Sequence, residues 1–138
     1  MVNAKIMIVD DDPDYIKVIK AILEKEQYTV VTASDKTEGM EKIRAEKPDL
    51  AILDVMMHAW QDGFEMSRQL KKDPHLKNMP VLMLTAVENR TGIGFKSTAG
   101  DPTWLPVDVF LDKPIEPDVL LAEVKKLLSN KAENGTGI

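Results

Sequence analysis

The stretch Lys5-Ile6-Met7-Ile8-Val9-Asp10-Asp11-Asp12-Pro13 decides the fold, because a short apolar run ends in three consecutive carboxylates. An unbroken apolar run of this length is typical of a strand buried on both faces of a parallel sheet. Asp12 followed by Pro13 is typical of a helix start, with aspartate as the N-cap and proline at the first helical position. The stretch therefore predicts a strand, a carboxylate-rich turn and a helix in direct succession.

Four further apolar runs follow, and helix-like patterns alternate with them. This alternation predicts an α/β fold, a doubly wound sheet of five parallel strands with helices on both faces. The methionines within these elements are expected to fill the core. The expected strands are residues 5–9, 28–33, 50–53, 80–84 and 107–111. One expected helix starts at Pro13, a second starts at Ser34 or Asp35, a third carries Phe64, Met66 and Leu70, and the last spans residues 117–128.

The composition limits the function classes. The 138 residues carry 18 basic and 23 acidic side chains, a net charge of -5, which argues against a direct nucleic-acid contact. The absence of cysteine excludes disulfides and thiolate metal sites and favours a cytoplasmic location. No apolar run approaches the roughly 18–20 residues that cross a bilayer, so no membrane insertion is expected. We expect one domain over residues 1–128 and a flexible polar tail over residues 129–138.

Polar side chains follow the predicted strands: Asp10 and Asp11 after the first, Asp54 after the third, Thr85 after the fourth and Lys113 after the fifth. In open α/β sheets, ligands bind at the carboxyl ends of the strands. Three converging carboxylates need a hard cation, and Mg²⁺ prefers oxygen ligands. A carboxylate can attack phosphorus, and phosphoryl transfer needs neutralised charge on the phosphoryl oxygens. The pattern predicts a Mg²⁺-dependent phosphoryl-transfer site.

Five stretches in this order resemble the receiver domains of two-component response regulators. They cover nearly the whole chain and come in the order in which the family carries them. The resemblance implies a flavodoxin-like sheet with strand order 2-1-3-4-5. The matching stretches are Ile6-Met7-Ile8-Val9-Asp10-Asp11-Asp12-Pro13, Pro48-Asp49-Leu50-Ala51-Ile52-Leu53-Asp54-Val55-Met56-Met57, Asp62-Gly63-Phe64-Glu65, Leu84-Thr85-Ala86 and Phe110-Leu111-Asp112-Lys113-Pro114.

The resemblance implies that Asp54 accepts a phosphoryl group from a sensor histidine kinase or a phosphotransfer protein. A downstream protein target would then read the change. The family's remaining roles carry over residue by residue: Asp10, Asp11, Asp54 and the backbone carbonyl of Met56 would hold Mg²⁺, Thr85 and Lys113 would contact the phosphoryl group, and Thr85 and Phe110 would form the switch.

Two segments depart from the family pattern. After Asp54, His58 replaces a proline in a loop that is longer than usual and carries Trp60. Between Thr85 and Phe110 the chain is also longer than the family pattern and rich in glycine and proline, so we expect an atypical fourth helix. Apolar residues two positions after the aspartate and the threonine, Met56 and Val87, predict slow self-dephosphorylation.

Three functions remain open at this point. The first is a stand-alone phosphorylation switch, which is not an enzyme acting on a separate substrate. The second is an aspartate-nucleophile phosphatase of the haloacid-dehalogenase type, for which Asp10 and Asp12 supply the motif but which leaves Asp54 unexplained. The third is a degenerate receiver that binds partners constitutively. Asp12 is expected to cap a helix, and His75 to lie in a surface loop.

Overall fold

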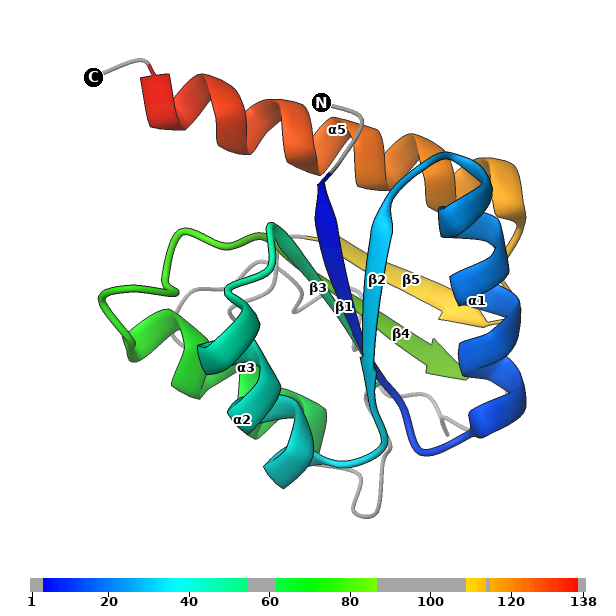
Figure 1. Ribbon diagram of the computed structural model, residues 1–138, viewed down its shortest axis with the longest axis horizontal. Helices are drawn as coiled ribbons and strands as arrows, with labels where there is room; N and C mark the ends of the chain where they lie inside the picture. The colour runs from blue at the N-terminus through cyan, green and yellow to red at the C-terminus, as the bar shows by residue number, and fades with distance from the viewer. Residues whose placement is uncertain (1–3, 55–61, 87–108, 114, 137–138) are drawn as a thin grey trace.

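The computed structural model describes residues 4–54, 62–86, 109–113 and 115–136. Its strands form one parallel sheet in the order β2-β1-β3-β4-β5, with helices on both faces (Figure 1). The predicted α/β fold with a parallel sheet is confirmed. The elements are β1 (Lys5–Val9), α1 (Pro13–Lys25), β2 (Thr29–Ala33), α2 (Lys36–Glu46), β3 (Leu50–Asp54), α3 (Asp62–Lys72), β4 (Val81–Ala86), β5 (Val109–Lys113) and α5 (Pro117–Thr136).

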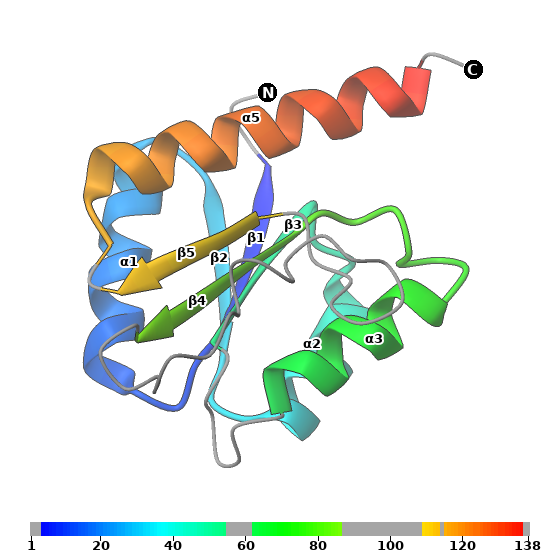
Figure 2. The same cartoon turned by 180° about the vertical axis from the view of Figure 1, so that it is seen from behind.

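Two hydrophobic layers enclose the sheet. One layer packs α1 and α5 against one face, and the other packs α2 and α3 against the opposite face; Figure 2 shows the same arrangement from behind. Successive strand residues point to opposite faces, so neighbours such as Ile52 and Leu53 belong to different layers. Met7, Met40, Met66 and Met83 are all buried, which confirms the prediction that they fill the core.

Two hydrogen bonds between Lys5 and Asp49, called the clamp below, join the amino-terminal ends of β1 and β3. The Lys5 amide donates to Asp49 Oδ2 at 2.8 Å, and the Asp49 amide donates to the Lys5 carbonyl at 2.7 Å. From this clamp the two strands run in parallel register, from Ile6 beside Leu50 to Val9 beside Leu53. Both strands therefore reach the opposite edge of the sheet at the same level.

Several elements extend beyond their predicted ends. β3, β4 and β5 include the polar residues that were expected to follow them, because the backbone ladder needs no apolar side chain: Thr85 pairs with Asp112, and Ala86 with Lys113. β5 accordingly spans Val109–Lys113 rather than residues 107–111. Helix α5 continues to Thr136 instead of ending at Leu128, since no proline and no glycine before Gly135 interrupts it.

The helix boundaries follow from capping. Asp35, rather than Ser34, caps α2, because its Oδ1 accepts the Glu38 amide at 2.8 Å. Lys47 ends the same helix in the left-handed conformation at φ 49°. The expected atypical fourth helix falls on residues 87–108, outside the described residues. Within the described part of the chain, none of the helices has the length and apolar character needed to span a bilayer.

Candidate functional site

Three carboxylates meet at the carboxyl edge of the sheet. Asp54 is the last residue of β3, and Asp10 directly follows β1 at the same level. One oxygen from each of Asp10, Asp11 and Asp54 lies within 4.8 Å of the others. Asp10 and Asp54 are buried, at 2% and 6% exposure, whereas Asp11 is exposed. The cluster therefore has two buried acids and one side open to solvent.

Backbone contacts fix Asp10 within this cluster. Its amide donates to the Ala33 carbonyl at 3.1 Å, which extends the pairing of β1 with β2 by one residue. Its Oδ1 accepts the amide of Asp12 at 2.9 Å, so the carboxylate orientation is set by the turn that leads into α1.

Asp12 serves the helix rather than the acidic cluster. Its Oδ1 accepts the amides of Asp14 and Tyr15, at 3.0 and 3.3 Å, as the N-cap of α1. The prediction that Asp12 is a cap is confirmed. The cap also places the positive end of the α1 dipole directly after Asp11, where it favours negative charge.

The cluster has the donor chemistry of a hard-cation site. Two buried carboxylates and a third nearby repel each other more strongly than they would in water, because the surrounding dielectric is low. A divalent cation relieves this repulsion, and the available ligand atoms are all carboxylate oxygens, which suit Mg²⁺. The residues present therefore fit the expected ion.

An ion pair lies at the rim of this edge and joins two helices. Lys36, in the first turn of α2, contacts Glu65, near the start of α3, with 2.7 Å between Nζ and Oε1. The hydrogen bond from Lys36, followed by its positive charge, lowers the pKa of Glu65. Sequence reasoning missed this pair because the two residues are 29 positions apart and follow no common periodicity.

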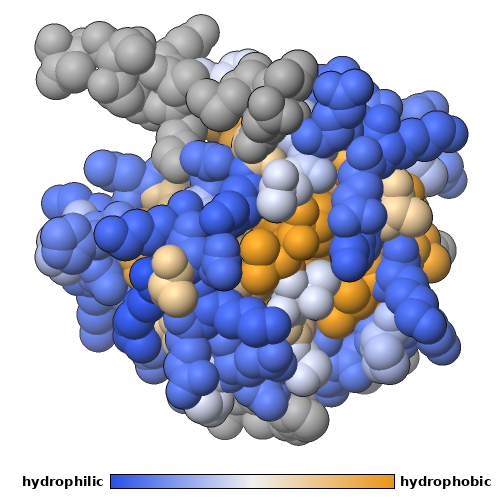
Figure 3. Space-filling model, in the orientation of Figure 1, coloured by the Kyte–Doolittle hydropathy of each residue, from blue (hydrophilic) through white to orange (hydrophobic). Residues whose placement is uncertain are grey.

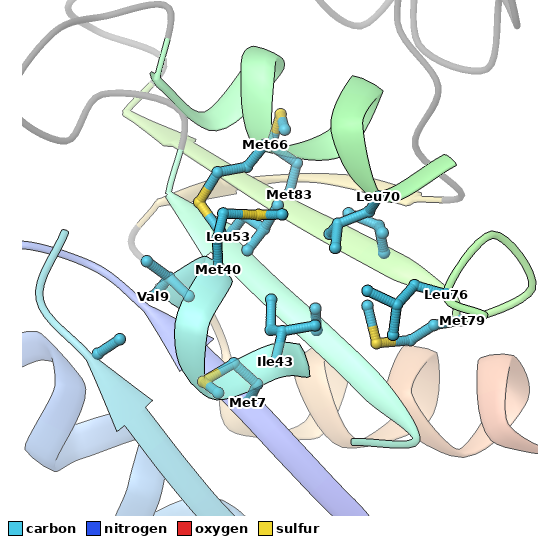
Figure 4. Close-up of a cluster of buried hydrophobic side chains, with 13 residues drawn as sticks. Met7, Val9, Met40, Ile43, Leu53, Met66, Leu70, Leu76, Met79 and Met83 are labelled. Atoms are coloured by element: carbon cyan, nitrogen blue, oxygen red, sulfur yellow. The ribbon is translucent and has the colours of Figure 1, made fainter. Parts of the chain in front are cut away.

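The methionine-rich layer lies beneath the same edge. Figure 4 shows Met40, Met66 and Met83 gathered near Val9 and Leu53, the residues that precede Asp10 and Asp54. At Gly39 of α2, an added Cβ would approach Met66 Cε and Val9 Cγ2 to 3.0 Å each. Helices α2 and α3 thus pack directly against the strand ends that carry the acids.

The other predicted site residues are described in part. Thr85 lies in β4, and Phe110 and Lys113 lie in β5, where the structure describes their strand positions: Phe110 pairs with Met83, and Lys113 with Ala86. The strands therefore bring Thr85 and Lys113 to the same edge as the acids. Met56, His58, Trp60 and Val87 lie outside the described residues. His75 is an exposed turn residue, as predicted.

Known proteins share this sequence pattern and this fold. Residues 6–125 match the family described as the response regulator receiver domain. Alkaline phosphatase synthesis transcriptional regulatory protein PhoP of Bacillus subtilis is 37% identical over 126 residues, which cover 91% of this chain and 49% of PhoP. Protein PilH of Pseudomonas aeruginosa is 32% identical over 128 residues, covering 91% of this chain and 98% of PilH.

Solved structures agree with these relatives. The chemotaxis response regulator CheY4 of Vibrio cholerae superposes with a TM-score of 0.77 at 28% identity, covering 91% of this chain and 98% of CheY4. This chain spans about half the length of PhoP and about a quarter of response regulator PleD of Caulobacter vibrioides.

Proposed function

Because this chain belongs to the response regulator receiver family of two-component signalling, we propose that it accepts a phosphoryl group on Asp54 in a Mg²⁺-dependent reaction. The observation that carries the proposal is the cluster of Asp10, Asp11 and Asp54, whose oxygens lie within 4.8 Å at the carboxyl edge of the sheet. Asp54 ends a strand that is buried throughout, so its carboxylate is held by a rigid element.

Asp54 supplies the nucleophile. One of its carboxylate oxygens forms a bond to phosphorus, and the bond between phosphorus and the donor breaks; with a phosphohistidine donor, the bonding electrons return to the imidazole nitrogen. The product is an acyl phosphate on Asp54. The reaction depends on positioning and on neutralised phosphoryl oxygens rather than on a separate base.

The carboxylates of Asp10, Asp11 and Asp54 and the backbone carbonyl of Met56 would hold the Mg²⁺ ion. When bound, the ion supplies positive charge to the phosphoryl oxygens and lets the buried acids coexist. Thr85 and Lys113 would contribute a hydroxyl and an ammonium to the same oxygens, and Phe110 would change rotamer with Thr85. Their strand positions in β4 and β5 support these roles.

The partners follow from the family. We infer a sensor histidine kinase or a phosphotransfer protein as the donor and a protein target downstream. The name of PhoP describes a transcriptional regulatory protein, and that of PilH names no target. Met56 and Val87, two positions after Asp54 and Thr85, are apolar and would not orient a hydrolytic water, so we propose a long-lived acyl phosphate.

Intact-mass measurement tests the proposal. The protein is incubated with a small phosphodonor and Mg²⁺, and the wild type is compared with Asp54→Asn. We expect the wild type to gain the mass of one phosphoryl group, and Asp54→Asn and a sample with chelator to gain nothing. Equal labelling of Asp54→Asn would overturn the assignment of the acceptor, and no uptake by the wild type would favour a constitutive binding module.

A further inference from the structure

Strand β2 forms an open edge of the sheet. Among the described strands it pairs with β1 alone, as the first strand in the order β2-β1-β3-β4-β5. The Thr29 amide donates to the Ala4 carbonyl at 2.9 Å, and the Ala33 carbonyl accepts the Asp10 amide at 3.1 Å. Because backbone groups alternate in direction along a strand, Val30 and Thr32 turn their amides and carbonyls away from β1.

The side chains along this edge are β-branched and partly exposed. Residues 29–32 read Thr-Val-Val-Thr, and Val30 and Val31 each pack partly against a different core layer. Figure 3 shows apolar side chains reaching the surface between α1 and α2, where Figure 1 places β2. An uncovered strand with such side chains is a template for pairing with another strand.

A lysine of the neighbouring helix occupies this edge. Lys42 of α2 donates from Nζ to the outward carbonyl of Thr32 at 2.7 Å. The same ammonium pairs with Glu38, at 3.0 Å from Oε2. Lys42 therefore both satisfies an outward acceptor of β2 and places a positive charge beside the strand, which is a known way to protect an exposed edge.

We propose that the open edge of β2 is a strand-pairing surface for β2 of a second copy of this chain, and that Lys42 keeps it closed. The strand is self-complementary about Val31: in an antiparallel arrangement, Val30 faces Thr32 of the second copy, and Thr32 faces its Val30. These are the two residues whose backbone groups point outward. Each Val30 amide would then donate to a Thr32 carbonyl across the dyad.

Closure by Lys42 acts through two effects. The ammonium already holds the Thr32 carbonyl, which the incoming Val30 amide would need. Pairing would also bring the Lys42 ammonium groups of the two copies close to each other across the dyad. These like charges would repel each other. A substitution that removes the charge of Lys42 but keeps its aliphatic chain should therefore allow the strands to pair without leaving a cavity.

The test compares Lys42→Met with Lys20→Met by sedimentation velocity over a concentration series, without phosphodonor or Mg²⁺. Lys20 is the matched control, because it also pairs with a glutamate four residues away, Glu24 at 4.0 Å, but lies on α1. We expect Lys42→Met to associate at concentrations where the wild type and Lys20→Met sediment alike, and Lys42→Arg to behave as the wild type. Sedimentation of Lys42→Met identical to that of the wild type would overturn the proposal.

A second variant separates strand pairing from general association. Thr32→Pro removes an outward amide that β1 does not use, a position where an edge strand tolerates proline. In the Lys42→Met background it should restore the sedimentation of the wild type, because it removes two of the four bonds across the dyad. Association that persists in the double variant would contradict pairing through β2, even where Lys42→Met is less stable.

Discussion

The two layers that cover the sheet are packed with different kinds of side chain. In the described residues, the layer under α2 and α3 contains five buried methionines, whereas the layer under α1 and α5 contains none and consists mainly of isoleucine, leucine and valine. Methionine is unbranched and adapts its shape to the space available, whereas isoleucine and valine are stiff at χ1. The five methionines are Met7, Met40, Met66, Met79 and Met83.

This difference has a consequence for the acidic edge. Asp10 and Asp54 follow Val9 and Leu53, and both of these residues face the methionine-rich layer. We therefore expect the residues just before the acids to be supported by the layer whose side chains adapt more easily. We expect the layer under α1 and α5 to be the more rigid of the two and the methionine-rich layer to be the more adaptable.

The largest expected effect comes from two neighbouring residues of β3 that point to opposite layers. Leu53→Ala should destabilise the protein by about 3 kcal/mol and Ile52→Ala by about 4 kcal/mol, because methionines can partly fill the first cavity. Both residues are fully buried, which makes the pair a matched comparison. Urea unfolding measures the two losses; an equal or greater loss for Leu53→Ala would remove the distinction between the layers.

A smaller loss is expected at Gly39, where α2 closely approaches Val9 of β1. Gly39→Val should cost about 2 kcal/mol, because the new side chain meets Val9, which is held in a strand, even if Met66 moves away. Valine has a higher helix propensity than glycine, so propensity alone would favour Gly39→Val; Ala45→Val, on the exposed side of the same helix, shows the cost of a valine that meets no neighbouring element. Thermal unfolding of both variants separates the terms, and similar losses would show that the close approach carries no energy.

Leucine and methionine can also be exchanged between the two layers. Leu23→Met in the stiff layer should cost about 1 kcal/mol, since methionine loses more side-chain entropy when it is ordered. Met66→Leu should cost about 0.5 kcal/mol, because the entropy regained offsets an imperfect fit. Both residues are fully buried in helices. Chemical denaturation gives the two values, and the reverse ranking would contradict the stated roles of the layers.

The smallest effect concerns pH at the rim of the methionine-rich side. Hydrogen bonds from the Ser34 amide, from Lys42 and from the Ser34 hydroxyl lower the pKa of Glu38 below its ordinary value of 4.5. The resulting stability is present above pH 4.5 and is lost as the pH falls through the folded-state pKa. The pair is exposed, so we expect about 0.5 kcal/mol.

Glu38→Gln provides the test of this linkage. It should flatten the acidic limb of a plot of unfolding free energy against pH, relative to the wild type. A slope that is unchanged below pH 4.5 would show that Glu38 binds its proton equally in the folded and unfolded states.

The sequence predicted the fold and the acidic cluster because both depend on local patterns. Apolar runs that end in aspartates place Asp10 and Asp54 at one edge of any parallel sheet, whatever the details of packing. The contact of Lys36 with Glu65 could not be predicted, because it depends on how α2 and α3 lie against each other. The strand ends were also missed, since backbone pairing continues through Asp112 and Lys113 without an apolar signal.

The clamp between Lys5 and Asp49 fixes the alignment of Asp10 with Asp54 at the opposite edge of the sheet. The two residues are 44 positions apart, and so are Asp10 and Asp54. A slip of β3 by one residue against β1 would break both bonds of the clamp and would exchange the faces of every side chain in the strand. Leu53 would then lie beside Asp10, and the Asp54 carboxylate would no longer lie at the same level as Asp10. The alignment of the acids is thus set five residues earlier, by an aspartate that is not part of the acidic cluster.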